Sequence, residues 1–269
     1  MAKVVTADES SSEVLEDYTE EEMQNGVLEI PDVLSRKQCE KLICRCEEIG
    51  FETLDTKKYD ASQRNNKRLF LNDPKLAAVL FSRLLGHVPA ILELGPHTKT
   101  LHSHRLLHGE WKLHGLDSRI RCYRYDQDNH FDRHEDYSDH VDPLRHRGML
   151  TLMVYLNDVA EGGSTQFYVH NGQRFEIRLA VNAEAGKAAV FHQRLTHRGE
   201  PVKSPPKYCL RTNVLYKRVD PVPELRPEEA AAVEAFRQAQ TIENEVEQIK
   251  ALCAAAEKWK DVEMYVEGY

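Results

Sequence analysis

A histidine and an aspartate stand two residues apart near the middle of the chain. His134 and Asp136 belong to the run CYRYDQDNHFDRHEDYS. In an extended segment, side chains two residues apart leave the same face, so both can bind one metal ion. A third ligand must come from another strand, and His197 in GKAAVFHQRLTHRGEPV can supply it. These residues predict a site for a single metal ion.

The ligand types indicate the chemistry of this site. Two imidazoles and one carboxylate on one face of a metal leave three positions open, an arrangement associated with non-haem Fe(II) oxygenases. A His-x-Asp pair alone is weak support, because the chain contains 13 histidines. A competing cluster contains His102, His104, His108 and His114. It lacks the glutamate that a zinc protease needs beside its first histidine, so we expect polar or capping roles there.

Short strand-like runs surround the proposed ligands from about residue 118 onward. Apolar and polar residues alternate in them, and Gly, Asn, Asp or Pro separates one run from the next. The runs are 119–125, 149–157, 165–169, 174–179, 188–192 and 207–216. Such a succession favours a closed or sandwich-like β structure. Gly162 and Gly163 are expected in a turn, because GGST lacks the second glycine of a nucleophile elbow.

Helical patterns precede and follow the strands. Ser35 can cap a helix that runs through residue 51, and Asp73 with Pro74 can open a second helix over 73–88. A third helix is predicted over 227–259. Its apolar stripe comprises Val233, Phe236, Ile242, Val246, Ile249 and Cys253. We expect the early helices to cover this stripe, or a second copy of the chain to do so in a homodimer.

Charge divides the chain into three regions. Residues 1–25 carry one lysine and eight acidic residues, and are expected to form a flexible tail. Residues 221–269, the predicted helical extension, carry five basic and eleven acidic residues. Because the whole chain has a net charge of -8, the expected oxygenase domain over 26–220 is mildly basic. That balance suits an anionic cosubstrate and is too weak to argue for nucleic acid.

Neither a membrane span nor a signal peptide is predicted. No run approaches the roughly 18 consecutive apolar residues of a span, and the N-terminal sequence turns acidic where a signal peptide would turn apolar. We therefore expect a cytoplasmic protein, with the nucleus as the alternative. The six cysteines include no C-x-x-C pair and are expected to be buried, reduced thiols. The spacing of Cys39, Cys44 and Cys46 is unlike that of zinc sites.

Four segments around the proposed ligands share a pattern with one protein family. They are RYDQDNHFDRHED, LTLMVYLNDVAEGGSTQF, GKAAVFHQRLTHRGEPV and PKYCLRTNVLY. The first resembles the R-Y-x-x-G-x-x-F-x-x-H-x-D segment of the prolyl 4-hydroxylase-like 2-oxoglutarate oxygenases. The others are similar to that family's inter-ligand strand and turn, its second-histidine segment and its last core strand. The resemblance covers roughly residues 26–217. The family's usual loop glycines are replaced by Asp126, Gln127, Asp128 and Asn129.

This resemblance implies an α+β fold, with a double-stranded β-helix or jelly roll and helices packed outside it. It implies Fe(II) at His134, Asp136 and His197, 2-oxoglutarate and O2 as cosubstrates, and ascorbate in a supporting role. Succinate and CO2 would be released. Related halogenases lack the carboxylate at the position of Asp136, so its presence favours hydroxylation or oxidative demethylation.

A basic residue in the last core strand is expected to bind the far carboxylate of 2-oxoglutarate. Lys207 and Arg211 share one face of KYCLRTNVLY. Arg211 is expected to make the principal salt bridge, because it lies deeper in the apolar run and its planar fork matches a carboxylate. Lys207 is second in line. Tyr125 and Tyr155 match positions near the cosubstrate in the family, with packing in the barrel core as the alternative for both.

The substrate remains open at this stage. Family frequency favours a protein or peptide side chain, prolyl residues among them, over a small molecule. RNNKR at 64–68 and PLRHR at 143–147 could line the path of an acidic substrate, with a solvated basic surface as the alternative. A nucleic-acid demethylase is disfavoured by the acidic ends and by the lack of an evident base-stacking motif. A non-catalytic binding protein that uses its C-terminal helix is the last alternative.

Overall fold

The computed structural model describes most of the chain between residues 26 and 242. The described residues are 26–53, 62–95, 105–136, 142, 144–170, 174–242, 247, 250–251 and 254–255. The predicted acidic tail at 1–25, together with His102 and His104 of the competing histidine cluster, lies outside them. No described helix is both long enough and apolar enough to cross a membrane.

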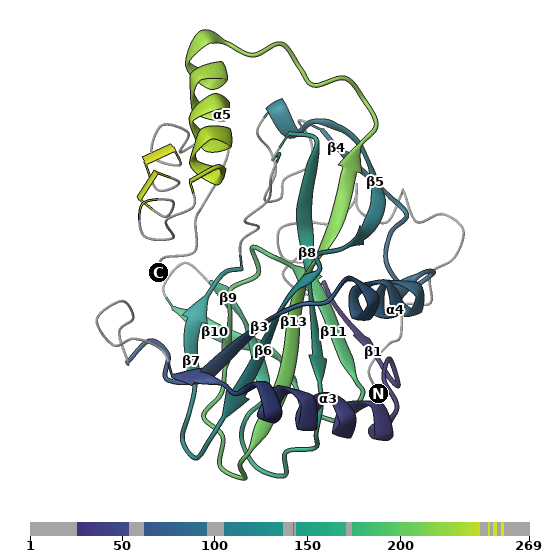
Figure 1. The fold of residues 1–269 in the computed structure, drawn as a ribbon, viewed down its shortest axis with the longest axis vertical. Helices are drawn as coiled ribbons and strands as arrows, with labels where there is room; N and C mark the ends of the chain where they lie inside the picture. Colours follow the sequence, from purple (N-terminus) through teal and green to yellow (C-terminus); the bar gives the residue numbers. More distant parts are fainter. Residues whose placement is uncertain are drawn as a thin grey trace.

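Two antiparallel sheets form the centre of the molecule (Figure 1). The strands of the larger sheet are β1 Val27–Ile30, β2 Glu52–Thr53, β3 Lys67–Asn72, β4 Ile91–Leu94, β5 Gly109–Leu116, β6 Arg119–Tyr125, β8 His146–Tyr155, β11 Ala188–His192 and β13 Lys207–Arg218. Its main order is β1-β11-β8-β13-β6-β3-β2, and β5 pairs with the second half of β13 and with β4. The smaller sheet has the strands β7 Phe131–His134, β9 Thr165–His170, β10 Phe175–Val181 and β12 His197–Gly199, in the order β10-β9-β12-β7.

The path of the chain between the sheets is that of a jelly roll. From β6 to β9 successive strands alternate between the larger and the smaller sheet, and from β11 to β13 they alternate again. The expected α+β fold with a double-stranded β-helix is confirmed. The predicted runs correspond to β6, β8, β9, β10, β11 and β13, whereas β3, β4 and β5 were not predicted.

Alternation along the strands separates two apolar clusters. Ile120 and Leu210 face outward and pack in the cluster that includes residues of the early helices. Tyr123 and Cys209 face inward, into the space between the two sheets. Because the side-chain period of a strand is two, each central strand contributes to both clusters. The inward face is the one that carries the predicted ligand and cosubstrate residues.

Two helices cover the outer face of the larger sheet, as predicted. In α3, Arg36–Ile49, Ser35 accepts a hydrogen bond from the backbone N–H of Gln38 and forms a capping box with it. In α4, Pro74–Leu84, Asp73 caps the helix by accepting from Leu76. This helix ends before residue 88, because the chain turns at Gly86 with a φ of +84°. Figure 1 shows α3 lying across the strands of the barrel.

The C-terminal helix is shorter than the sequence predicts. Helix α5, Pro227–Gln240, ends at Thr241, so a single helix over 227–259 is wrong. Val233 and Phe236 are buried in the main apolar cluster of the same chain. The helix is also held by an ion pair between Glu229 and Arg105, next to the 3-10 turn Arg105–Leu107. Ile242 follows the helix, and the remaining stripe residues Val246, Ile249 and Cys253 lie outside the described residues. A homodimer through this region remains a prediction.

The cysteine prediction is largely confirmed. Cys39, Cys46, Cys122 and Cys209 are buried and free, as expected. Cys44 is the exception, because it is exposed on α3. Cys253 lies outside the described residues.

Candidate metal centre

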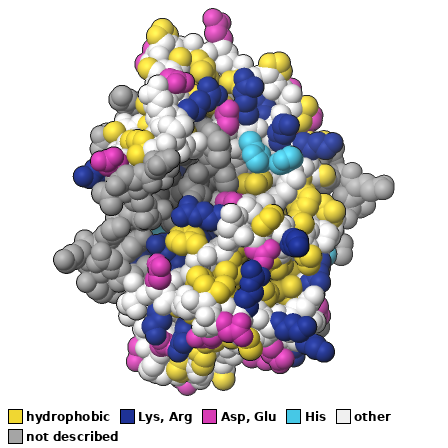
Figure 2. Space-filling model, in the orientation of Figure 1, with side chains coloured by type: hydrophobic (Ala, Val, Ile, Leu, Met, Phe, Trp, Pro, Cys, Tyr) yellow, Lys and Arg dark blue, Asp and Glu magenta, His cyan; other side chains and the backbone are white. Residues whose placement is uncertain are grey.

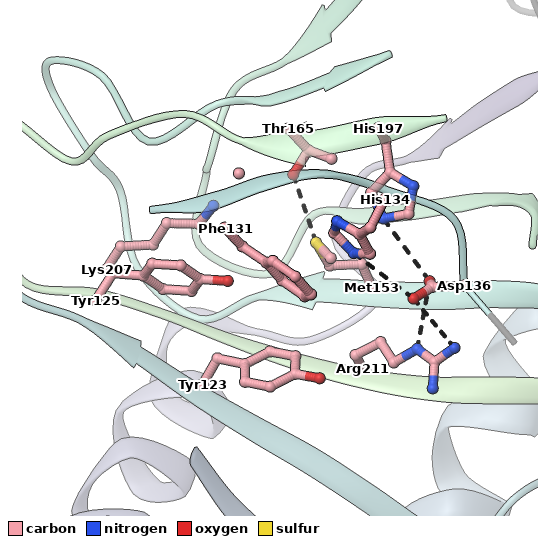
Figure 3. A pocket seen from close by; sticks show the side chains of 11 residues that line it. Tyr123, Tyr125, Phe131, His134, Asp136, Met153, Thr165, His197, Lys207 and Arg211 are labelled. Carbon is pink, nitrogen blue, oxygen red and sulfur yellow. Dashed lines mark hydrogen bonds and ion pairs between the residues drawn. The ribbon is translucent and has the colours of Figure 1, made fainter. Parts of the chain in front are cut away.

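The three predicted metal ligands meet between neighbouring strands of the smaller sheet. His134 ends β7 and His197 begins β12, and the two residues are direct partners in the antiparallel register. Their ring centroids are 4.3 Å apart. Asp136 follows β7 by two residues, and the ligand atoms of all three side chains lie within 4.8 Å of one another (Figure 3). Among the described residues, no other group of three or more histidine, cysteine or acidic side chains is close enough to hold a metal ion.

Backbone carbonyls orient both imidazoles toward the centre. Nδ1 of His134 lies 2.8 Å from the carbonyl oxygen of Asp132, and Nδ1 of His197 lies 2.8 Å from that of Leu195. A carbonyl oxygen only accepts hydrogen bonds, so both Nδ1 atoms carry the proton and both Nε2 atoms offer a lone pair. Burial lowers the pKa of both imidazoles, which favours the neutral form that binds metals.

Asp136 is buried and held in its ionised form. Thr151 Oγ1 donates to Oδ2 of Asp136 at 2.7 Å. Arg211 approaches both carboxylate oxygens, with Nη2 at 3.3 Å from Oδ1 and Nε at 3.4 Å from Oδ2. Burial by itself would raise the pKa of Asp136, but the positive charge of Arg211 and the hydrogen bond from Thr151 oppose burial, and that pKa lies well below its usual range. The carboxylate is therefore charged and ready to bind a cation.

This donor set fits a non-haem Fe(II) ion. It offers two neutral imidazole nitrogens and one carboxylate oxygen from one side, which is the facial arrangement of ligands that leaves other positions open. Nε2 of His134 and Nε2 of His197 lie 3.9 and 3.8 Å from the carboxylate oxygens of Asp136. The hydrogen bonds to both imidazoles and to Asp136 provide the outer support that metal ligands commonly have.

The three ligands line one pocket between the two sheets. Aromatic rings form much of its wall, and Phe131 stacks on His134 with the ring centroids 3.5 Å apart. The lining residues are Tyr123, Tyr125, Phe131, His134, Asp136, Met153, Thr165, His197, Gly199, Lys207 and Arg211. Both predicted cations are thus in the same pocket as the metal ligands.

Lys207 and Arg211 lie at different ends of this pocket. Figure 3 shows Arg211 beside Asp136, and Lys207 next to Tyr125 on the other side of His134. Lys207 is 2% exposed, and its Nζ donates to the carbonyl of Gly163 at 2.6 Å. The ammonium also lies 5.0 Å from the centre of the Tyr125 ring. Burial lowers the pKa of Lys207, because a desolvated ammonium is less stable.

The two predicted tyrosines differ in their relation to the pocket. Tyr125 lines it, whereas Tyr155 is fully buried and is absent from the lining. The hydroxyl of Tyr155 donates to Oγ1 of Thr165 at 2.8 Å, and Thr165 does line the pocket. Tyr155 therefore contacts two lining residues from behind: its hydroxyl donates to Thr165, and its ring centroid lies 5.5 Å from the Lys207 ammonium.

The turn before β9 brings a carbonyl to Lys207. Gly162 and Gly163 have φ values of +70° and +69°, which confirms the predicted glycine turn. A Cβ on Gly162 would lie 2.3 Å from the carbonyl oxygen of Pro201, so only glycine fits there. The next carbonyl, that of Gly163, accepts the hydrogen bond from Lys207.

The loop before the first ligand turns without glycine. Asp128 adopts a left-handed conformation with φ of +58°, and the side chain of Asn129 accepts from the backbone N–H of Asp126 at 2.9 Å. Aspartate and asparagine tolerate such conformations better than most residues. The departure from the family pattern at 126–129 therefore leaves His134 and Asp136 in position.

Several lining residues were not identified from the sequence. They are Tyr123, Phe131, Met153, Thr165 and Gly199. Two could have been found by alternation, because Tyr123 shares a face with Tyr125 and Met153 shares one with Tyr155. Thr151, which donates a hydrogen bond to Asp136, lies two residues before Met153 on the same face of β8.

Part of the chain matches a known protein family. Residues 120–215 match the model of the 2OG-Fe(II) oxygenase superfamily, which confirms the resemblance at the level of that superfamily. No curated protein matches the chain.

Solved structures of prolyl hydroxylases resemble the fold only loosely. A viral collagen prolyl hydroxylase from Paramecium Bursaria Chlorella virus-1, in complex with 2-oxoglutarate, is 20% identical with a TM-score of 0.44, and the match covers 72% of this chain and 98% of that one. A Pseudomonas putida prolyl-4-hydroxylase is 15% identical with a TM-score of 0.47, covering 72% and 92%. A Trichoplax adhaerens prolyl hydroxylase, in complex with a peptide fragment of hypoxia inducible factor, is 14% identical with a TM-score of 0.47, covering 81% and 88%.

Proposed function

We propose that this chain, whose residues 120–215 match the 2OG-Fe(II) oxygenase superfamily, is an active Fe(II)- and 2-oxoglutarate-dependent dioxygenase that hydroxylates its substrate. The observation that carries this proposal is one pocket that contains a complete His134, Asp136 and His197 ligand set and a separate buried cation. A binding protein without turnover would have no need for both.

We assign the far carboxylate of 2-oxoglutarate to Lys207, reversing the order expected from the sequence. Arg211 already contacts a carboxylate, that of Asp136. Among the described residues, the hydrogen-bond partner of the Lys207 ammonium is a neutral carbonyl, that of Gly163. A buried charge is costly unless it is paired, so an arriving anion gains more at Lys207 than at Arg211.

The roles of the other pocket residues follow from this assignment. When bound, the iron and 2-oxoglutarate supply the oxidising chemistry, in which 2-oxoglutarate and O2 yield succinate, CO2 and one oxygen atom for a substrate C–H bond. His134, Asp136 and His197 hold the metal. Tyr125 and Thr165 can donate hydrogen bonds to the cosubstrate, and the rings of Tyr123 and Phe131 keep water out of the pocket. Arg211 and Thr151 hold Asp136 in the orientation that binds the metal.

The substrate class and the type of reaction are also part of this proposal. We propose a protein or peptide side chain as substrate, prolyl residues among the candidates, in the cytoplasm and with ascorbate as a supporting reductant. The intact carboxylate of Asp136 favours hydroxylation over halogenation. Oxidative demethylation on the same metal site is the alternative outcome, and a mass gain of about 16 units in a peptide screen would separate the two.

Anaerobic metal titration tests the proposal directly. Fe(II) added with 2-oxoglutarate should give the weak visible charge-transfer band of a chelated keto acid. Asp136→Ala should abolish the band, and Lys203→Met on the surface should keep it. A wild-type protein that is folded, binds one Fe(II) and yields no band with 2-oxoglutarate would refute the proposed function. Retention of the band in Asp136→Ala would refute the ligand assignment.

A further inference from the structure

The chain between β11 and β12 contacts two of the three metal ligands. It comprises residues 193–196, which we call the ligand turn. The carbonyl of Gln193 accepts a hydrogen bond from the backbone N–H of Asp136 at 2.7 Å. Two residues later, the carbonyl of Leu195 accepts from Nδ1 of His197 at 2.8 Å. The position of the ligand turn therefore affects the placement of both Asp136 and His197.

A buried amide pair connects the ligand turn to the larger sheet. Nε2 of Gln193 donates to Oδ1 of Asn213 in β13 at 2.9 Å. Gln193 is 3% exposed and Asn213 is 0% exposed. A buried amide is costly to leave without its hydrogen bond, so this pair favours one position of the Gln193 side chain. Because the same residue supplies the carbonyl that meets Asp136, anchoring its side chain also restricts where that carbonyl lies.

Asn213 lies next to the residues that hold the carboxylate of Asp136. It is two residues from Arg211 in β13, so the two side chains share a face. In the antiparallel register it pairs with Thr151 of β8, and cross-strand partners also project to the same face. Arg211 and Thr151 contact the carboxylate of Asp136. Asn213 acts on the backbone of Asp136 instead, through Gln193.

An ion pair also connects the ligand turn to the segment of the first two ligands. Nε of Arg194 lies 2.7 Å from Oε2 of Glu135, the residue between His134 and Asp136. Both side chains are partly exposed, at 23% and 28%. Figure 2 shows Lys, Arg, Asp and Glu side chains interspersed over the displayed face, and ion pairs in contact with solvent contribute little to stability. We therefore expect the buried amide pair to be the stronger of the two connections.

An apolar pair could fill the space of the two amides. Methionine and leucine have shapes close to those of glutamine and asparagine, and neither needs a hydrogen-bond partner in the interior. What the amides add is direction, because a hydrogen bond requires its donor to face its acceptor at short range. Defined orientation of ligands is what the outer partners of a metal centre provide.

We propose that Gln193, anchored by Asn213, is a positioning residue of the metal centre, which places Asp136 and His197 through the ligand turn. This inference rests on the proposed function, because it takes the three ligands to hold one metal ion. Neither Gln193 nor Asn213 is among the residues that line the pocket. Both therefore act through the metal ligands and not on the substrate.

The test is a double-mutant cycle on metal binding by the full chain. The variants are Gln193→Met, Asn213→Leu and the combination of both, and calorimetry gives the Kd for Mn(II). Tyr216→Phe is the matched control, because it removes a different hydrogen bond of β13, from the Tyr216 hydroxyl to the carbonyl of Pro89, outside the pocket. Melting temperatures establish that the variants fold. Asn213→Leu breaks the same hydrogen bond from its other side, and replaces Gln193→Met if that variant does not fold.

Each single variant should raise the Kd for Mn(II) by about five- to tenfold, because outer partners of metal ligands typically contribute 10- to 100-fold and these act through the backbone. The double variant should bind within about twofold of the weaker single variant, because both changes break the same hydrogen bond. Tyr216→Phe should keep the wild-type Kd. The EPR line shape of bound Mn(II) reports the ligand geometry, so at saturation it should change in Gln193→Met and not in Tyr216→Phe.

The inference is overturned if the folded single variants keep the wild-type Kd and line shape, if their effects add in the double variant, or if Tyr216→Phe weakens Mn(II) binding as much as they do. The charge-transfer band of wild type with Fe(II) and 2-oxoglutarate reports on the proposed function alone. A wild type that gives the band, beside variants with unchanged Mn(II) binding, defeats this inference and leaves the oxygenase proposal standing. A folded wild type that binds Mn(II) and gives no band counts against the oxygenase proposal itself.

Discussion

The two cations of β13 lie four residues apart on one face of one strand, yet they have different surroundings. Arg211 contacts both carboxylate oxygens of Asp136, a residue distant in the sequence. Lys207 hydrogen-bonds a neutral carbonyl and lies over the rings of Tyr125 and Tyr155. A pattern of inward basic residues in the sequence thus identifies a charged pocket. It does not show which of the two cations already contacts a carboxylate. Under the proposed function, this difference favours metal-ligand positioning for Arg211 and cosubstrate binding for Lys207.

Asp136→Ala should have the largest effect on stability, because it removes the carboxylate that the buried Arg211 contacts. Loss of one partner of a buried ion pair costs roughly 3–5 kcal/mol, so the free energy of unfolding of metal-free Asp136→Ala should fall by about that amount in urea. The double variant Asp136→Ala/Arg211→Met should recover most of the loss. Equal stability of wild type and Asp136→Ala would show that this pair contributes little to folding.

Arg211→Met tests the positioning role itself. Asp136 would lose two contacts at 3.3 and 3.4 Å while the three metal ligands remain. Outer partners of metal ligands typically contribute 10- to 100-fold to affinity, so we expect the Kd for Mn(II), measured by calorimetry, to rise by at least about tenfold. Lys203→Met is the surface control. An unchanged Mn(II) affinity would remove the positioning role from Arg211.

Thr151→Val is a nearly isosteric change that tests the second side chain supporting Asp136. It removes the hydroxyl that donates to Asp136 at 2.7 Å and leaves Arg211 in place. Because one of the three contacts to Asp136 is lost, the Kd for Mn(II) should rise by about three- to tenfold, less than in Arg211→Met. A larger loss than in Arg211→Met would make the hydroxyl the dominant support.

The pH dependence of stability probes the Lys207 end. Burial lowers the pKa of Lys207 in the folded state below the ordinary value of 10.5. Between that lowered pKa and 10.5 the unfolded state binds more protons, so folding stability rises with pH in this window. Without 2-oxoglutarate, wild type should therefore gain stability relative to Lys207→Met as pH increases toward 10.5. A difference in unfolding free energy that stays constant with pH would contradict the account of Lys207 as a desolvated cation.

The sequence predicted the elements that depend on local pattern. Ser35 and Asp73 cap helices as expected, and the strand-like run 119–125 has the bounds of β6. The proximity of His134 and Asp136 was also predictable, because side chains two residues apart in an extended segment leave the same face. The end of α5 at Gln240 was missed, since the apolar stripe continues past Thr241 without a proline or glycine.

Contacts between distant segments account for the rest. The partner of Arg211 is 75 residues away, and no local pattern specifies which of two inward cations will meet Asp136. The pairing of β3 with β6 was missed for the same reason, and β3 itself was not predicted. Sequence alternation gives the face of a residue, and only the register gives its neighbours.

The most direct test is the Kd for 2-oxoglutarate in Lys207→Met and Arg211→Met, measured with saturating Mn(II) and with folding verified. Because loss of a desolvated charge pair costs several kcal/mol, Lys207→Met should weaken 2-oxoglutarate binding by about 100-fold or more. Arg211→Met should remain within a few-fold of wild type once the metal site is filled. If Arg211→Met abolishes binding while Lys207→Met stays within a few-fold of wild type, the division of roles along β13 is wrong.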